Sequence, residues 1–154
     1  MKTYQLECLA EFWRDAEHIF PVHYKEMALK KERFPMALDF PKYAQAENDG
    51  VLHIVTVRDA GRLVGYFIAG ITGHLHYATS GLMAYNDMYF ILPEHRRGGT
   101  GAKMFVKVLE TLRERGVVEG YFSTKVHQDH GAFFEALGGE LTDKTYRISL
   151  GRGA

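Results

Sequence analysis

The sequence lacks most of the features that mark a specialised class of protein. Its 154 residues include a single cysteine, Cys8, so no internal disulfide can form, and this usage fits a reducing cytosol. No apolar run reaches the roughly 18 residues of a transmembrane helix, and acidic residues come too early for a signal peptide. We therefore expect a cytoplasmic protein that does not enter a membrane.

The chain also lacks an excess of charge of either sign. Lys plus Arg and Asp plus Glu number 19 each, so the bulk charge does not direct the protein to nucleic acid or to an anionic membrane. There is no internal repeat, low-complexity tract or obvious linker. The length suits one sizeable core, and we predict a single domain over residues 1–154, as a monomer or a homodimer.

Hydrophobic periodicity and turn residues divide the chain into helices and strands. The pattern predicts strands at residues 2–8, 51–57, 62–72, 82–92, 120–126 and 141–150, and helices at residues 9–20, 22–29, 41–50, 100–115 and 131–139. The strand–helix–strand crossover at residues 82–126 implies one parallel pair of strands. The predicted fold class is therefore α/β (α+β), a mixed central sheet flanked by helices.

One stretch, PEHRRGGTGAKMF at residues 93–105, places two arginines and three glycines where a strand leads into a helix. The two best-known phosphate loops are absent, because the chain has no G-x-x-x-x-G-K-[ST] string and no G-x-G-x-x-G string. What is present is Arg-x-x-Gly-x-Gly, formed by Arg96, Gly99 and Gly101. Free backbone N–H groups at a helix N-terminus, with arginines beside them, predict a phosphate site. A tight turn without a ligand is the alternative.

The longer stretch at residues 87–117, DMYFILPEHRRGGTGAKMFVKVLETLRERGV, resembles the acetyl-CoA-binding segment of the GNAT N-acetyltransferase superfamily. In that family a strand ends near a proline, and [Arg/Gln]-x-x-Gly-x-[Gly/Ala] opens the next helix. The order of the other predicted elements resembles the family over nearly the whole chain. The tract HLHY at residues 74–77, with a later Asp before the core strand, is similar to small GNAT proteins of bacteriophages and their hosts.

The resemblance implies that acetyl-CoA is the acyl donor and that a primary amine attacks the thioester directly in a ternary complex. It places the pantetheine arm between two splayed parallel strands, beside the backbone of Phe90, Ile91 and Leu92. It places the pyrophosphate on the backbone N–H groups of Arg96, Arg97, Gly98, Gly99, Thr100, Gly101 and Ala102. Glycines at 99 and 101 let that backbone approach the phosphates closely.

The late helix departs from the family pattern. Many members carry a tyrosine there as general acid, and the matching residue here is Phe134, which has no proton to give. Either the thiolate leaves unaided, or Tyr146, Tyr121 or a water supplies the proton, or the activity is weak or lost. The alternative function is therefore a GNAT-fold module that binds CoA or a protein partner without turnover.

Direct attack also requires a base, because an alkyl ammonium is protonated at neutral pH. Asp87 interrupts an apolar strand just before the predicted cofactor segment, and we expect burial to raise its pKa. Glu26 and the pair His74 and His76 are further candidates, from loops that could cover the same site. No third and fourth ligand accompanies the two histidines, so we expect no metal. The sequence does not identify the amine, which belongs to a small molecule or to a protein or peptide.

Overall fold

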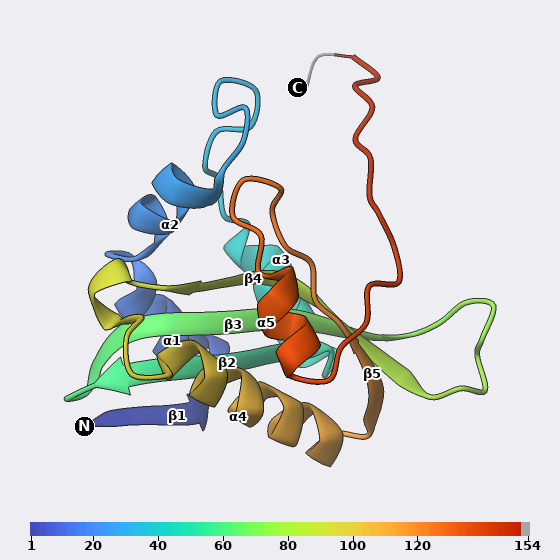
Figure 1. The fold of residues 1–154 in the computed structure, drawn as a ribbon, viewed down its shortest axis with the longest axis horizontal. Coiled ribbons are helices and arrows are strands. Elements are labelled where there is room, and N and C mark those ends of the chain that lie inside the picture. The colour runs from blue at the N-terminus through green and yellow to red at the C-terminus, as the bar shows by residue number, and fades with distance from the viewer. Residues whose placement is uncertain (152–154) are drawn as a thin grey trace.

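The computed structural model describes residues 1–151, and its five strands form one sheet in the order β1-β2-β3-β4-β5 (Figure 1). The strands are β1 (Lys2–Leu6), β2 (Leu52–Asp59), β3 (Arg62–Gly73), β4 (Leu82–Ile91) and β5 (Val117–Tyr121). Neighbouring strands are antiparallel except β4 and β5, which pair in parallel. The predicted mixed sheet with one parallel pair is confirmed.

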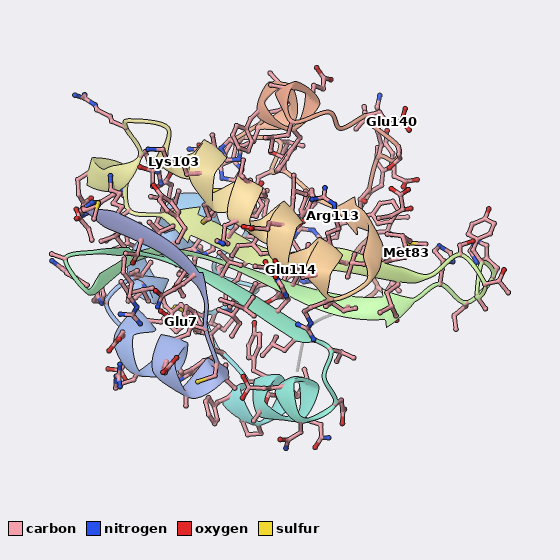
Figure 2. All side chains as sticks on the ribbon, turned by 90° about the horizontal axis from the view of Figure 1, so that it is seen from below. Glu7, Met83, Lys103, Arg113, Glu114 and Glu140 are labelled. Atoms are coloured by element: carbon pink, nitrogen blue, oxygen red, sulfur yellow. The ribbon has the colours of Figure 1, made fainter. Side chains whose placement is uncertain are left out.

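Helices cover both faces of this sheet. They are α1 (Leu9–Ala16), α2 (Phe20–Met27), α3 (Phe40–Asn48), the 3-10 turn η1 (Pro93–His95), α4 (Thr100–Glu114) and α5 (Gly131–Ala136). Figure 2 shows the gold helix α4 on one side of the sheet and the blue α1 and teal α3 on the other. No helix within residues 1–151 has the length and apolar character needed to cross a membrane.

Successive side chains of β3 fill the two layers of the core. The fully buried Tyr66 ring packs edge-on against Phe12 of α1, with centroids 5.1 Å apart. The next residue, Phe67, points to the opposite face and packs edge-on against Phe105 of α4 at 5.6 Å. Because neighbouring side chains of a strand point to opposite faces, β3 is buried on both sides and reads as a nearly continuous apolar run.

Two boundaries differ from the sequence prediction. Helix α1 already ends at Ala16, and α2 begins at Phe20 with Pro21 in its first turn, so Pro21 starts a helix rather than stopping one. The strand expected at residues 120–126 begins at residue 117, directly after Gly116 with its φ of +81°, and ends at Tyr121. The β4–β5 pairing is therefore short, which matters for the site.

The strand predicted at residues 141–150 is wrong. The described part of this tail forms no strand, and its apolar side chains are exposed. The tail instead contacts the segment that follows α2, where Arg33 donates a hydrogen bond to Ser149 Oγ at 2.8 Å. Figure 1 shows the red tail running away from the sheet. Alternating hydrophobicity does not make a strand unless a neighbouring strand supplies hydrogen-bond partners.

Candidate active site

β4 and β5 pair only at the start of their course and then separate. The parallel ladder joins residues 82–85 of β4 to residues 117–121. Beyond it, side chains bridge the gap: the Ser123 N–H donates to Asn86 Oδ1 at 2.6 Å, and the Tyr89 hydroxyl donates to the Ser123 carbonyl at 2.8 Å. A wedge therefore opens between the second half of β4 and the segment after β5.

Asp87 lies where β4 is irregular. The register with β3 shifts between Ile68 and Ala69, which leaves Asp87 outside the ladder. Such a bulge re-aims side chains and is common beside active sites. The Tyr43 hydroxyl of α3 donates a hydrogen bond to Asp87 Oδ2. Asp87 itself is exposed, so the burial expected for its carboxyl group is wrong.

Tyr43 is held as a neutral donor to this carboxylate. Burial of the phenol raises the pKa of Tyr43, and the hydrogen bond to Asp87 raises that pKa further. The hydroxyl therefore keeps its proton at neutral pH and orients one oxygen of Asp87. The other oxygen stays open to solvent or to a substrate.

The glycine-rich loop leads from η1 into α4. Gly98 and Gly99 both have a φ of +75°, in the left-handed region that favours glycine, and Gly99 is the N-cap of α4. No backbone carbonyl of residues 1–151 accepts a hydrogen bond from the N–H groups of residues 97–102. Six successive N–H groups without a backbone acceptor, at the positive end of a helix dipole, are suited to binding an anion.

Arg96 joins this loop to β4 and to α2. Its Nε donates to the Ile91 carbonyl at 2.9 Å, and its guanidinium lies 5.1 Å from the centroid of the Phe90 ring. A terminal nitrogen pairs with Glu26 Oε2 at 2.8 Å. The structure therefore places Glu26 at the glycine-rich loop, in an ion pair with Arg96.

A largely apolar cavity of about 230 Å³ lies between this loop and the wedge. Its lining combines residues of α2, β4, the glycine-rich loop, α4 and the start of α5: Glu26, Met27, Tyr89, Phe90, Ile91, Arg96, Gly101, Met104, Phe105, His130 and Phe133. Gly101 leaves room at the mouth, because a Cβ there would come no closer than 4.0 Å to Ile91 Cδ1. The cavity thus runs from the free N–H groups to the unpaired edge of β4.

Of the three residues expected to contact pantetheine, Phe90 and Ile91 line this cavity and Leu92 does not. The Leu92 N–H donates to the Val64 carbonyl at 2.9 Å, and its own carbonyl accepts from the His95 N–H at 2.9 Å. Both main-chain groups of Leu92 are therefore already engaged.

The histidine pair His74 and His76 lies elsewhere. Their rings are 4.1 Å apart in the turn between β3 and β4, and Figure 1 shows this green hairpin tip projecting at the far end of the sheet from η1. The 10 residues of β4 separate the hairpin tip from the glycine-rich loop, a span of roughly 30 Å for a strand. The structure does not bring these imidazoles to the glycine-rich loop.

The proton donors considered from the sequence do not line the cavity either. Tyr146 is 83% exposed on the tail. Tyr121 stacks on Tyr85 with ring centroids 4.9 Å apart, at the position where β4 and β5 still pair. Within residues 1–151, no group of three or more His, Cys, Asp or Glu side chains is arranged to hold a metal ion.

Sequence reasoning missed His23, Tyr43, Tyr89 and Lys2. The His23 ring stacks on Phe90 at 4.5 Å, and Lys2 Nζ lies 3.1 Å from the Thr100 hydroxyl at the start of α4. Tyr89 lies within the stretch at residues 87–117, but His23, Tyr43 and Lys2 lie in no motif, and each reaches the site from a different element. Of the four, only Tyr89 could have been noticed in the sequence, because it lies two residues after Asp87.

Comparison with known proteins decides the family. A family model described as the acetyltransferase (GNAT) family matches residues 8–138. The chain belongs to the GNAT acetyltransferase family. GNAT acetyltransferases use acetyl-CoA.

Solved structures share this GNAT fold over nearly the whole chain. An aminoglycoside acetyltransferase, HMB0005, from an uncultured soil metagenomic sample has a TM-score of 0.75 at 12% identity, covering 98% of this chain and 99% of that chain. A ribosomal-protein-alanine N-acetyltransferase from Brucella melitensis biovar Abortus 2308 has a TM-score of 0.68 at 18% identity, covering 98% and 100%. A transcriptional regulator from Bacillus halodurans C-125 has a TM-score of 0.71 at 16% identity, covering 97% and 100%. At these identities the likeness shows the fold alone. A search of curated protein sequences gives no match.

Proposed function

We propose that this protein transfers the acetyl group of acetyl-CoA to a primary amine, by direct attack in a ternary complex. The observation that carries the proposal is the run of N–H groups at residues 97–102, which lack a backbone partner in the described chain and adjoin the cavity. An anionic diphosphate would satisfy these donors, and the glycines of the loop let it approach.

The donor would then extend from the loop into the wedge. Its pantetheine arm would lie in the apolar cavity against Phe90 and Ile91 and would meet the β4 edge that β5 leaves unpaired. Its thioester would lie near the point where the two strands separate. Holding the thioester there beside an amine removes the entropy cost of a bimolecular encounter.

Asp87 is the base in this proposal. Its carboxylate projects from the bulge of β4, and Tyr43 fixes one of its oxygens by a hydrogen bond. The free oxygen would take a proton from the substrate ammonium, and the neutral amine would attack the acetyl carbonyl. Glu26 is better assigned to holding Arg96 at the phosphate loop.

The acceptor is proposed only as an amine. The related structures include one protein named for aminoglycosides and one named for the alanine of a ribosomal protein. These acceptors differ greatly in size and share only the amino group. We infer a cytoplasmic enzyme for a small-molecule or peptide amine, without a metal.

A second candidate is a module that binds CoA without turnover. Phe134 favours it, because this residue occupies the position where many family members carry a proton-donating tyrosine. The two candidates separate cleanly: a binding module would be stabilised by acetyl-CoA but would release no thiol with any amine.

The test is a screen of amines with acetyl-CoA, read as free thiol, using the natural protein and Asp87→Asn. We expect turnover with at least one amine, and we expect Asp87→Asn to lower kcat/KM by about 10²–10⁴-fold at neutral pH while acetyl-CoA affinity is retained. A less basic amine, already neutral at that pH, should recover part of the loss. Glu119→Gln, which removes an exposed carboxylate of β5, is the control and should retain full activity. Full activity of Asp87→Asn would exclude it as the base.

A further inference from the structure

Loss of the acetyl group leaves CoA with a thiolate, and a donor that stabilises this sulfur speeds its departure. The phenyl ring of Phe134 cannot be that donor. Under the proposed function, the donor to the sulfur comes from the polar side chains that line the cavity. Those side chains are Glu26, Tyr89, Arg96 and His130. Glu26 and Arg96 are paired with each other at the phosphate end, which leaves Tyr89 and His130.

Tyr89 lines the cavity and bridges the wedge. Its hydroxyl donates to the Ser123 carbonyl across the gap between β4 and the segment after β5, and it lies 3.4 Å from His130 Nδ1. The Tyr89 ring packs edge-on against Phe105 at 5.4 Å and against Phe134 at 6.1 Å. A rigid aromatic wall thus holds one hydroxyl beside the unpaired edge of β4.

We propose that Tyr89 donates a hydrogen bond and then a proton to the departing CoA sulfur, with His130 positioning its hydroxyl. As the amine nitrogen bonds to the carbonyl carbon, the C–S bond breaks and its electron pair stays on sulfur. The Tyr89 O–H turns from the Ser123 carbonyl to that sulfur and transfers its proton. His130 passes a proton from Nδ1 to the phenolate oxygen while Nε2 takes one from water. The hydroxide left behind takes the surplus proton of the new amide nitrogen, and proton exchange with water returns His130 to its Nδ1–H tautomer.

The protonation state of the phenol agrees with this role. Burial of the ring raises the pKa of Tyr89 to about 12, so the hydroxyl holds its proton at neutral pH. A phenol of this pKa is a weaker acid than an ordinary thiol. The hydrogen bond from Tyr89 to the developing thiolate is therefore what accelerates the loss of CoA. Complete transfer of the Tyr89 proton to sulfur depends on the proton that His130 returns to the phenolate.

The first test compares Tyr89→Phe with Tyr121→Phe. Both changes remove one hydroxyl and keep the ring, but only Tyr89 lines the cavity. We expect Tyr89→Phe to lower kcat by about 10²-fold with the acetyl-CoA dissociation constant unchanged, and Tyr121→Phe to change kcat by less than about threefold. Moving the hydroxyl to the neighbouring ring, in the double variant Tyr89→Phe with Phe134→Tyr, should restore part of the lost rate. A kcat for Tyr89→Phe within about threefold of the natural protein would overturn the proposal.

The second test does not need turnover. At about pH 9.5, where a thiol is largely ionised, calorimetry would compare the binding of CoA and of desulfo-CoA. The natural protein should prefer CoA by at least about tenfold through the hydrogen bond to sulfur, and Tyr89→Phe should lose that preference. Equal affinities of the natural protein for the two ligands would overturn the Tyr89 contact. A lost preference in a protein that acetylates no amine would refute the proposed function and leave the Tyr89 contact standing.

Discussion

At the scale of single residues, burial lowers the pKa of two imidazoles, His23 beside the candidate site and His53 in the core. The His23 ring lies between Phe90, on which it stacks, and the Tyr66 hydroxyl, 2.6 Å from Nδ1. Burial lowers the pKa of His23 to about 4, and the nearby Arg96 lowers that pKa further while Glu26 opposes it. His53, buried beneath α4, has its pKa lowered to about 4 by burial and by the neighbouring Arg115.

These two histidines predict acid sensitivity of the fold. Each pKa lies below the ordinary value of 6.5, so the unfolded chain binds more protons than the folded chain between pH 6.5 and about 4. The unfolding free energy should therefore fall as pH decreases through this window, by at most about 1.4 kcal/mol per pH unit for each histidine. Urea unfolding at several pH values gives the unfolding free energy as a function of pH. This free energy should depend less steeply on pH in His23→Gln or His53→Gln than in the natural protein, and least steeply in the double variant. Slopes equal to that of the natural protein would contradict the assignment.

Single residues could be predicted from the sequence only where a local motif contains them. The spacing of Arg96, Gly99 and Gly101 identified the loop, because a helix start gathers its donors from consecutive residues. Tyr43 could not be found this way, since it meets Asp87 across 44 positions of the chain. His74 and His76 were misplaced because their spacing says nothing about which end of the sheet the hairpin occupies.

At the scale of elements, the close approach of β3 to β4 shapes the cavity wall. Gly65 of β3 lies opposite Ile91, and a Cβ on Gly65 would come within 2.9 Å of Ile91 Cγ1 and 3.0 Å of the Phe90 carbonyl oxygen. Glycine at this position lets the end of β4 sit where Phe90 and Ile91 line the cavity. A Cβ on Gly70, in the same strand, would meet no atom within 4 Å.

We therefore predict different results from two alanine substitutions in one strand. Gly65→Ala should lower the unfolding free energy by about 1–3 kcal/mol through overpacking, and it should weaken acetyl-CoA binding by displacing the end of β4. Gly70→Ala, the matched control, should change neither quantity appreciably. Thermal unfolding and calorimetric titration measure both effects. Equal behaviour of the two variants would show that the packing of Gly65 does not set the position of the β4 end.

Strand and helix positions could largely be predicted because burial makes apolar residues recur at the spacing of the strand or helix that contains them. Both faces of β3 are covered, and its continuous apolar run was identified correctly. The tail at residues 141–150 alternates apolar and polar residues, a pattern that also predicts a strand, yet it forms none. A periodic pattern reports which side chains could be buried, whereas pairing depends on a free strand edge that only the assembled sheet reveals.

At the scale of the whole molecule, the sheet separates two tasks. The helices α1 and α3 pack on one face of the sheet, and α4 packs on the other (Figure 2). Tyr43 of α3 donates its hydrogen bond to Asp87 on the first face, and the glycine-rich loop lies at the start of α4. In our proposal, the wedge where β4 and β5 separate would connect these two sides. Under the proposed function, the acyl donor and the amine would approach the same point from opposite faces of the sheet.

The measurement that tests this account most directly is the thermal shift caused by acetyl-CoA in the natural protein and in Gly101→Asp. Gly101 lies in the first turn of α4, where a Cβ would meet only Ile91 Cδ1, at 4.0 Å, so the new carboxylate should leave the unliganded protein as stable as before. At a ligand concentration of about 100 times the dissociation constant, the natural protein should gain about 2.7 kcal/mol, a rise in Tm of roughly 5–10 °C. Gly101→Asp should lose the shift because its charge repels the diphosphate, and the uncharged Gly101→Asn should lose less of it. A full shift in Gly101→Asp would contradict the claim that the start of α4 binds acetyl-CoA.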